Sequence, residues 1–427
     1  MTFYDIIAKK RDNLELTKEE IEFFINGVIT KKIPDYQIAA LLMAIRLNGL
    51  KNEELFNLTD FMAKSGDMVD LTDISKPTCD KHSTGGVGDK TTFIVAPILA
   101  AAGIVTAKMS GRGLGFTGGT IDKLESIEGF KTDLSFKDFK NILLENNFSI
   151  TSTSGNIALA DKYLYQLRDV TATVDSVPLI ASSVMSKKLA AGSKNIVLDV
   201  KCGSGAFMKT KKDAIRLAKL MVKIGKNAGR NVTALITDMS CPLGESVGNS
   251  LEINEALNIL EGKTFNGFTT LCLSLAASGI QISLNMPYKK AYNFAKELLI
   301  SGKAKDCFLN MVKKQGGNIN NIKNAKNSYN IYAKTSGYIS KIDAEEVGKT
   351  AIILGAGRLL KEDKIDYGAG ILFNKTKGDY VLKGEILATL YSDNSDSFKT
   401  AEEMLLNSIL VTKFKPKKAK IIIKRID

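Results

Sequence analysis

The sequence has no tryptophan and only one histidine among its 427 residues. Aromatic residues make up 7% of the chain, so no stacking platform for nucleic-acid bases is evident. The net charge of +13 invites a nucleic-acid partner, but lysines are spread along the whole chain, and only residues 413–425 form a basic cluster. We therefore expect a solvated, lysine-rich surface and no nucleic-acid binding, with part of the charge attracting small anionic substrates.

Cysteines are few and widely scattered, at positions 79, 202, 241, 272 and 307. No CxxC pair occurs, so zinc and dithiol redox motifs are not supported. An odd number of distant cysteines is typical of reduced thiols in a cytoplasmic protein. The N-terminus lacks a long apolar stretch, and no apolar run approaches the ~20 residues of a membrane span. We expect a cytoplasmic protein without a membrane partner.

The pattern along the chain predicts an α/β protein with three parts. Residues 1–65 have helical periodicity, with a capping box at Thr17 and Glu20. Strand and helix patterns alternate through the middle third, which favours a mixed, mainly parallel sheet in a larger α/β domain. After a linker-like stretch, short alternating runs separated by glycines indicate a β-rich C-terminal lobe, with residues 350–355 and 421–423 among its strands.

Two glycine-rich segments, Ser83 to Gly88 and Ser110 to Gly119, flank an apolar run that predicts a buried helix and a short strand. Glycines let backbone amides approach an anion closely. Positive charge comes from Lys81, Lys108 and Arg112, and hydroxyl groups from Ser83, Thr84, Thr91, Thr92, Ser110, Thr117 and Thr120. Neither GxxxxGK[ST] nor GxGxxG is present. The chemistry predicts a phosphate cradle beyond the carboxyl ends of the strands.

A second polar region covers residues 158–191. If this region is helical, Ser183 and Lys187 share one face because they are four residues apart. Arg168 lies upstream, beside a turn-rich segment. Together the three side chains could offer several donors to a polar heterocycle or a carboxylate. The bare spacing fits a surface salt-bridge set better, so both interpretations stay open from the residues alone.

Three runs, DKHSTGGVGDKTT, KMSGRGLGFTGGTIDKLES and LRDVTATVDSVPLIASSVMSKK, together resemble the thymidine and pyrimidine-nucleoside phosphorylases. The resemblance continues through KCGSGAFM and DMSCPLGESVGNSLEINEAL and covers nearly the whole chain. It implies reversible phosphorolysis of pyrimidine nucleosides (thymidine, and also uridine and deoxyuridine) to free base and (deoxy)ribose 1-phosphate. Inorganic phosphate would be the co-substrate, and no cofactor would be required.

The resemblance also implies an architecture. The chain would be a homodimer whose small helical domain is discontinuous, formed by residues 1–66 and 160–191. Residues 67–159 and 192–330 would form the α/β domain, and residues 331–427 a β-rich part packed on it. Substrates would bind in the cleft between the helical and α/β domains.

Matching the motif positions assigns roles to individual residues. The catalytic residues would be His82, Arg168 and Lys187, with His82 near the O2 oxygen of the pyrimidine. The base would also contact Ser183, Tyr165 and Ile180. Phosphate would be held by Lys81, Ser83, Thr92, Lys108, Ser110 and Thr120. These assignments suit the reaction, because negative charge builds on the departing base and preorganised donors stabilise it.

Two residues depart from the family pattern. Phe116 stands where the family often has a histidine, which removes a polar contact across the cleft. Lys90 stands where many bacterial relatives have an uncharged residue. Some of those relatives bind a monovalent cation, such as potassium, through groups matching Gly88, Leu243, Ser246 and Glu255. An ammonium group at position 90 would disfavour or replace that ion.

One other enzyme class also fits the glycine loops. A phosphoribosyltransferase of the anthranilate type has a related fold and needs acidic residues for magnesium and pyrophosphate. Asp199, Asp238 and Glu245 are the candidates for that role. No adjacent Asp-Glu pair follows the strands at the expected place, so this alternative is the weaker one.

Overall fold

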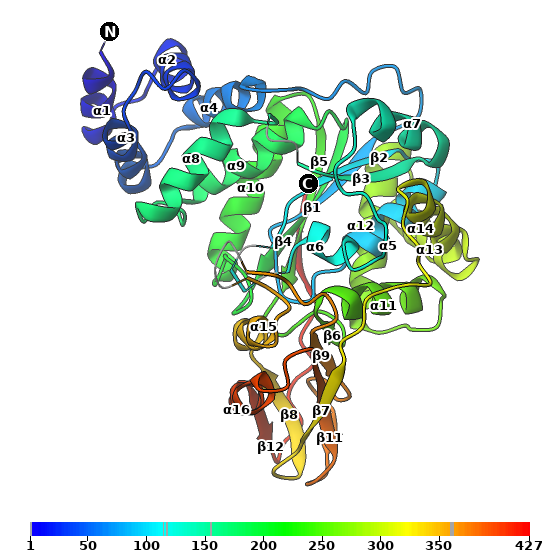
Figure 1. Cartoon of the computed structure of the whole chain (residues 1–427). Coiled ribbons are helices and arrows are strands. Elements are labelled where there is room, and N and C mark those ends of the chain that lie inside the picture. The colour runs from blue at the N-terminus through cyan, green and yellow to red at the C-terminus, as the bar shows by residue number, and fades with distance from the viewer. Residues whose placement is uncertain (1, 114, 117, 154–155, 359–362) are drawn as a thin grey trace.

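A computed structural model of the chain describes residues 2–113, 115–116, 118–153, 156–358 and 363–427. Thr117, one of the hydroxyl donors expected from the sequence, lies outside these residues. Figure 1 shows three regions: a group of helices at one end, a central sheet covered by helices, and a β-rich lobe at the far end. The predicted fold class, with a small helical part, a larger α/β part and a β-rich lobe, is confirmed.

The first four helices and two later ones share an apolar core (Figure 1). They are α1 Phe3–Arg11, α2 Lys18–Ile29, α3 Asp35–Asn48, α4 Asn52–Lys64, α8 Leu159–Val170 and α9 Val177–Ala190. Thr17 and Glu20 form the predicted capping box at the start of α2. Ala160, Leu164 and Leu179 bury their side chains among those of α1 to α3. Two segments far apart in sequence therefore pack as one helical layer.

The central sheet is mixed and mainly parallel, as predicted. Its strands β1 Cys79–Ser83, β4 Asn195–Cys202 and β5 Asn231–Asp238 are parallel, and β13 Ile422–Ile426 pairs with β5 in the antiparallel sense. The parallel pair β2 Thr106–Ser110 and β3 Phe148–Ser152 lies beside β1, joined to it by a bridge between Thr78 and Val105. Both glycine segments and the loop after β4 follow the carboxyl ends of parallel strands, so they meet at one edge.

Alternating residues of β4 show how the sheet is covered on both faces. Ile196, Leu198 and Val200 pack against α10 Lys211–Asn227, whereas Val197 lies in the core formed with α5 Thr92–Ala101 and α12 Gly267–Leu284. Helix α5 is the apolar helix expected after the first glycine segment. The remaining helices of this part are α6 Thr120–Leu124, α7 Phe136–Asn146, α11 Asn249–Leu260, α13 Tyr288–Ile300 and α14 Lys303–Lys314.

Helix α12 is the one described helix that is long and apolar enough to cross a membrane, which the sequence pattern did not indicate. Of its length, 67% is buried inside the structure. It packs against β1, β4 and α5, in the position of a core helix.

The C-terminal lobe contains two antiparallel sheets (Figure 1). One has the order β10-β8-β12 and the other β6-β9-β11-β7. Their bounds are β6 Ser246–Val247, β7 Asn327–Tyr332, β8 Gly337–Ile342, β9 Gly370–Phe373, β10 Tyr380–Val381, β11 Ile386–Ser392 and β12 Ile409–Thr412, with helices α15 Ala344–Ile353 and α16 Ser397–Ser408 beside them. Strand β6 comes from the α/β part, so the second sheet links the two regions.

Two segments differ from the pattern expected in the lobe. The predicted strand at residues 350–355 is wrong, because residues up to Ile353 belong to helix α15. Asp343 caps that helix by accepting bonds from the amides of Glu345 and Glu346, and this start signal outweighs the β-branched residues that follow. The last strand, β13, leaves the lobe and completes the central sheet beside β5.

Candidate active site

A cavity of about 330 Å³ lies at the carboxyl edge of the central sheet, facing helices α8 and α9. Its volume is in the range of small-molecule sites, about 300–1,000 Å³. One side is formed by both glycine segments, and the other by residues of the second polar region. Eleven of the twelve side chains predicted for catalysis, base binding and phosphate binding line it: His82, Ser83, Thr92, Lys108, Ser110, Thr120, Tyr165, Arg168, Ile180, Ser183 and Lys187.

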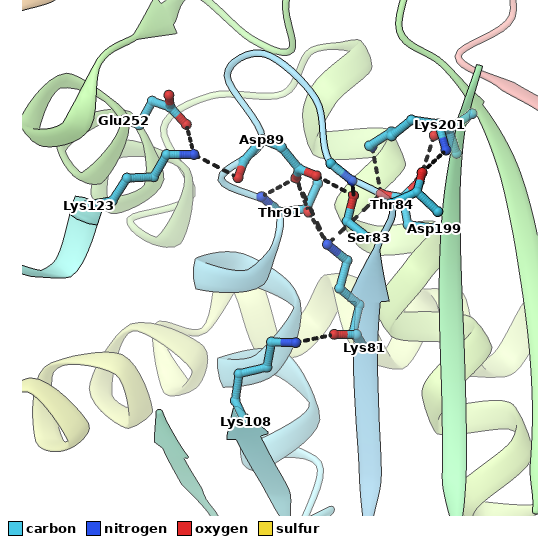
Figure 2. A network of polar contacts seen from close by, with 12 residues as sticks. Lys81, Ser83, Thr84, Asp89, Thr91, Lys108, Lys123, Asp199, Lys201 and Glu252 are labelled. Carbon is cyan, nitrogen blue, oxygen red and sulfur yellow. Dashed lines mark hydrogen bonds and ion pairs between the residues drawn. The ribbon is translucent and has the colours of Figure 1, made fainter. Parts of the chain in front are cut away.

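Lys81 is the predicted phosphate residue that does not line the cavity. Its side chain is 1% exposed, and its ammonium donates a hydrogen bond to Oγ1 of Thr91 (Figure 2). The same ammonium lies 3.9 Å from a carboxylate oxygen of Asp89 and 4.0 Å from one of Asp199. Lys81 therefore stabilises the first glycine segment from the side that faces away from the cavity.

Asp89 connects the polar groups of that segment (Figure 2). Its carboxylate accepts hydrogen bonds from the hydroxyl groups of Ser83 and Thr91. Burial is the largest single influence on the pKa of Asp89 and acts to raise it, but the ammonium groups of Lys81 and Lys201 and these two bonds together hold it well below its usual value. An ionised Asp89 orients the hydroxyl of Ser83 at the cavity wall and that of Thr91 behind it.

Lys108 is buried beneath the cavity. Its ammonium donates to the backbone carbonyl of Lys81 at 2.7 Å and lies 3.3 Å from the carboxylate of Asp80. Asp80 also pairs with Lys188 at 2.7 Å. Burial lowers the pKa of Lys108 to about 7; Asp80 opposes this change, whereas Lys188 and Lys81 add to it. A bound anion would raise this pKa again, so Lys108 would take up a proton when the anion binds.

The second glycine segment is held by carboxylates of the following helix. Arg112 bonds to both carboxylate oxygens of Glu125, at 2.5 and 2.6 Å, and to Asp122 at 3.2 Å. Asp122 also accepts the amide of Gly113 at 2.6 Å. A Cβ on Gly119 would lie 2.1 Å from that amide nitrogen, so this close turn requires glycine. Two carboxylates thus balance the charge of Arg112, which holds the loop in place.

Arg168 is fixed on the opposite side of the cavity. It is 2% exposed, and three of its N–H groups donate to the backbone carbonyls of Thr173, Val174 and Leu179 at 3.3, 2.7 and 3.3 Å. A guanidinium has five N–H donors, so two remain for a ligand. The ring of Tyr165 lies 5.8 Å from the guanidinium carbon. This rigid cation suits an oxygen on which negative charge develops.

Ser183 and Lys187 share one face of α9, as their spacing predicted. The Lys187 ammonium donates to Oγ of Ser183 at 3.2 Å, which leaves the serine proton for a ligand. It also pairs with Asp161 of α8, whose side chain is 1% exposed. Asp161 was missed in the sequence, although it lies on α8 seven residues before Arg168, on a similar face of the helix.

His82 lies between the two halves of the cavity, at the end of β1. Burial is the main reason why its pKa is held well below the usual value, and the nearby ammonium groups of Lys188, Lys108, Lys81 and Lys187 lower it further. The imidazole is therefore neutral at pH 7. In that state it donates one N–H, so it acts as a hydrogen-bond donor without carrying a positive charge.

Several further lining residues were not assigned from the sequence, among them Asp89, Val184, Lys188 and Phe207. Phe207 follows β4 in the loop KCGSGAFM and is 47% exposed. Phe116 does not line this cavity; its ring lies 5.8 Å from the ammonium of Lys209. Phe116 therefore makes a cation–π contact with Lys209, in place of the polar contact that a histidine would make across the cleft.

The residues matched to a cation site lie together around Lys90. Its ammonium donates to the carbonyls of Leu243 and Ser246 at 2.6 and 2.9 Å and pairs with Glu255 at 2.7 Å. The carbonyl of Gly88 accepts the backbone amide of Lys90 at 3.0 Å. The described part of the chain contains no group of three or more His, Cys, Asp or Glu side chains that could hold a metal ion.

The acidic residues considered as magnesium ligands lie outside the cavity, and two of them bind other groups of the protein. Asp199 is fully buried, pairs with Lys201 at 2.6 Å and accepts the hydroxyl of Thr237 at 2.6 Å. Asp238 accepts the amide of Ser240 at 3.0 Å. Neither of these acids nor Glu245 is among the described residues that line the cavity. The geometry therefore gives no support to the phosphoribosyltransferase alternative.

Comparisons with known proteins place the chain in a family. Family models match three stretches: the glycosyl transferase family helical bundle domain at residues 4–66, its a/b domain at residues 75–305, and the pyrimidine nucleoside phosphorylase C-terminal domain at residues 338–412. Pyrimidine-nucleoside phosphorylases of Staphylococcus epidermidis ATCC 12228 and Staphylococcus aureus N315 are 49% identical over 406 residues, 93% of this chain and of theirs. The chain belongs to the pyrimidine-nucleoside phosphorylase family. The resemblance of its motifs is thereby confirmed, and the protein is an enzyme.

One solved structure shows how far this phosphorylase shares its fold. Anthranilate phosphoribosyltransferase from Thermus thermophilus aligns with a TM-score of 0.59 and 17% sequence identity, over 72% of this chain and 98% of that one. At this identity the likeness concerns the fold alone. The described fold therefore occurs in both enzyme classes, so the fold by itself does not identify the reaction.

Proposed function

We propose that this enzyme catalyses the reversible phosphorolysis of pyrimidine nucleosides, with thymidine, uridine and deoxyuridine as substrates. A phosphate oxygen attacks C1′ of the sugar while the bond from C1′ to N1 of the base breaks. The electron pair of that bond goes to the pyrimidine, which takes up the proton that the phosphate loses, and the products are free base and (deoxy)ribose 1-phosphate. The observation that supports the proposal is one cavity lined by both glycine segments on one side and by Arg168, Ser183 and Lys187 on the other.

The glycine-segment side would hold phosphate. Ser83, Thr92, Ser110 and Thr120 supply hydroxyl groups, and Lys108 supplies an ammonium whose charge increases when the anion binds. Lys81 would contribute from behind the loop, through Thr91 and Asp89. A cradle assembled before binding lowers the entropic cost of placing the nucleophile.

The helical side would hold the base. Arg168, Ser183 and Lys187 would donate to the pyrimidine, and Tyr165 and Ile180 would flank its ring. Negative charge grows on the base as the glycosidic bond breaks, so these donors stabilise the transition state more than the substrate. His82 would donate its N–H to O2; removing it in His82→Ala should lower kcat by roughly 10²- to 10⁴-fold.

The test is base release from thymidine and uridine with and without phosphate. We expect free base only when phosphate is present, with Arg168→Gln strongly impaired. Lys64→Gln, at an exposed position on α4, is the control and should retain full activity. If no base is released from either nucleoside, the proposal is wrong.

We also propose a homodimer that associates through the helical layer. Tyr36, Met43 and Leu47 form one stripe on α3 and are 75%, 37% and 74% exposed, with Tyr4 of α1 at 68%. Exposed apolar side chains gathered on one element are typical of an interface. Light scattering should give twice the chain mass, and the mass of Leu47→Glu should fall; a monomeric wild-type protein would refute this assembly.

No organic cofactor is needed for this chemistry, since phosphate is the nucleophile. The cytoplasmic location stays a prediction, based on five cysteines that the structure shows as free thiols. Whether the enzyme uses a potassium ion depends on the ammonium of Lys90 and the oxygen atoms around it.

A further inference from the structure

Lys90 lies outside the cavity, and its side chain is fully buried (0% exposed), which is unusual for a lysine. Its ammonium has three oxygen partners from two distant segments: the carbonyls of Leu243 and Ser246 and the carboxylate of Glu255. The ring of Phe268 lies 5.0 Å away. All three N–H donors of the ammonium are thus matched by an acceptor.

The oxygens around Lys90 do not fit an additional cation. Glu255, besides pairing with Lys90, accepts the backbone amides of Glu245 and Ser246, at distances of 2.7 to 3.1 Å. The cage is also closely packed: a Cβ on Gly244, whose φ is +70°, would lie 2.0 Å from Glu255 Oε1 and 2.8 Å from the Lys90 nitrogen. A second positive charge there would be repelled by the ammonium and would share one carboxylate with it.

We propose that Lys90 is a positioning residue that serves as a built-in monovalent cation, so that this enzyme needs no potassium. The ammonium binds the same carbonyl and carboxylate groups that would otherwise coordinate the ion. The ligand class is a potassium-sized monovalent cation, and the site becomes available to it only when the lysine side chain is removed.

The location of Lys90 explains how it acts on the active site. It directly follows Asp89, whose carboxylate orients Ser83 and Thr91 (Figure 2). The backbone carbonyl of Asp89 accepts the ammonium of Lys123 at 3.0 Å, and Lys123 pairs with Glu252 of α11 at 2.7 Å. Helix α11 thus presents Glu252 and Glu255, three residues apart, to two buried lysines. The two pairs fix the first glycine segment.

The first measurement uses the wild-type enzyme. Its kcat and its KM for phosphate should be the same in potassium, sodium and tetramethylammonium chloride at equal ionic strength of about 0.1 M, so that charge screening is constant. A loss of tenfold or more in kcat/KM when potassium is replaced by tetramethylammonium would overturn the proposal.

The second measurement uses Lys90→Ser, which opens the cage and adds a hydroxyl oxygen. In tetramethylammonium its kcat/KM for phosphate should fall by about tenfold or more, the usual cost of losing a supporting contact. Potassium or ammonium should restore activity and raise the melting temperature of this variant. The wild-type protein and the exposed control Lys64→Ser should show no potassium-specific change in melting temperature.

The activity readout rests on the proposed phosphorolysis, whereas the melting temperature does not. A variant whose melting temperature is insensitive to potassium, or one that keeps full activity without it, would overturn the role of Lys90. If Lys90→Ser does not fold, the wild-type comparison still decides whether the enzyme depends on the cation.

Discussion

The ammonium of Lys187 is paired with the buried carboxylate of Asp161, across helices α8 and α9. This pair places Lys187 beside Ser183, and both side chains line the cavity on the side of α9. We predict that Asp161→Asn lowers kcat/KM for the nucleoside by ~10- to 100-fold, because a charged hydrogen bond is worth about 1.5–3 kcal/mol. Steady-state kinetics with phosphate saturating will measure this.

The matched control for this prediction is Asp60→Asn. Asp60 also pairs with a lysine, but both side chains are exposed, at 47% and 62%. Such a pair contributes little, so this variant should keep its activity. Equal effects of the two substitutions, or an unchanged Asp161→Asn enzyme, would show that Asp161 does not position Lys187.

Lys81 and Ser110 were both predicted to bind phosphate, and the structure separates them. Lys81→Met leaves the buried carboxylates of Asp89 and Asp199 with one cation fewer, so it should lower the free energy of unfolding by about 3 kcal/mol. Ser110→Ala removes a hydroxyl from the cavity wall and should weaken phosphate binding with little change in stability. Urea denaturation and the KM for phosphate distinguish the two; a stable Lys81→Met protein would contradict this separation.

The meeting of the glycine segments was predictable because loops after parallel strands share one edge of the sheet. The shared face of Ser183 and Lys187 followed from helical spacing. That the side chain of Lys81 points away from the cavity was not predicted. It could have been deduced, because neighbouring strand residues point to opposite faces and His82 faces the cavity. Charge partners such as Asp161 depend on tertiary packing between helices. The predicted strand at residues 350–355 failed for a local reason: residues up to Ile353 belong to helix α15, whose cap at Asp343 outweighs its β-branched residues.

His82 should titrate below the ordinary histidine value. Its native pKa is lowered, mainly by burial, so the neutral imidazole prevails at pH 7 and the charged form is populated only in more acidic solution. Because the chain has one histidine, a proton NMR spectrum shows a single imidazole Cε1 resonance, and His82→Ala confirms its assignment. A midpoint at or above about 6.5 would contradict the lowered pKa of His82.

Phosphate binding should take up a proton at about pH 8. In the free enzyme burial gives Lys108 a pKa of about 7, so at pH 8 much of it is neutral; a bound anion favours the ammonium and raises that pKa. Affinity should therefore decrease as the pH rises above 7. Calorimetry in two buffers of different ionisation enthalpy will detect the proton, and Lys108→Gln should abolish the difference. Identical enthalpies for the wild-type enzyme would contradict this linkage.

The central claim is that phosphate in the glycine-segment cradle attacks the sugar of a pyrimidine nucleoside held by α8 and α9. Phosphorus NMR of a reaction with thymidine and phosphate tests it most directly. We predict one pentose 1-phosphate formed for each thymine released, and much slower formation of both products with Arg168→Gln. Release of thymine without a sugar phosphate, or no reaction of the wild-type enzyme, would contradict the account.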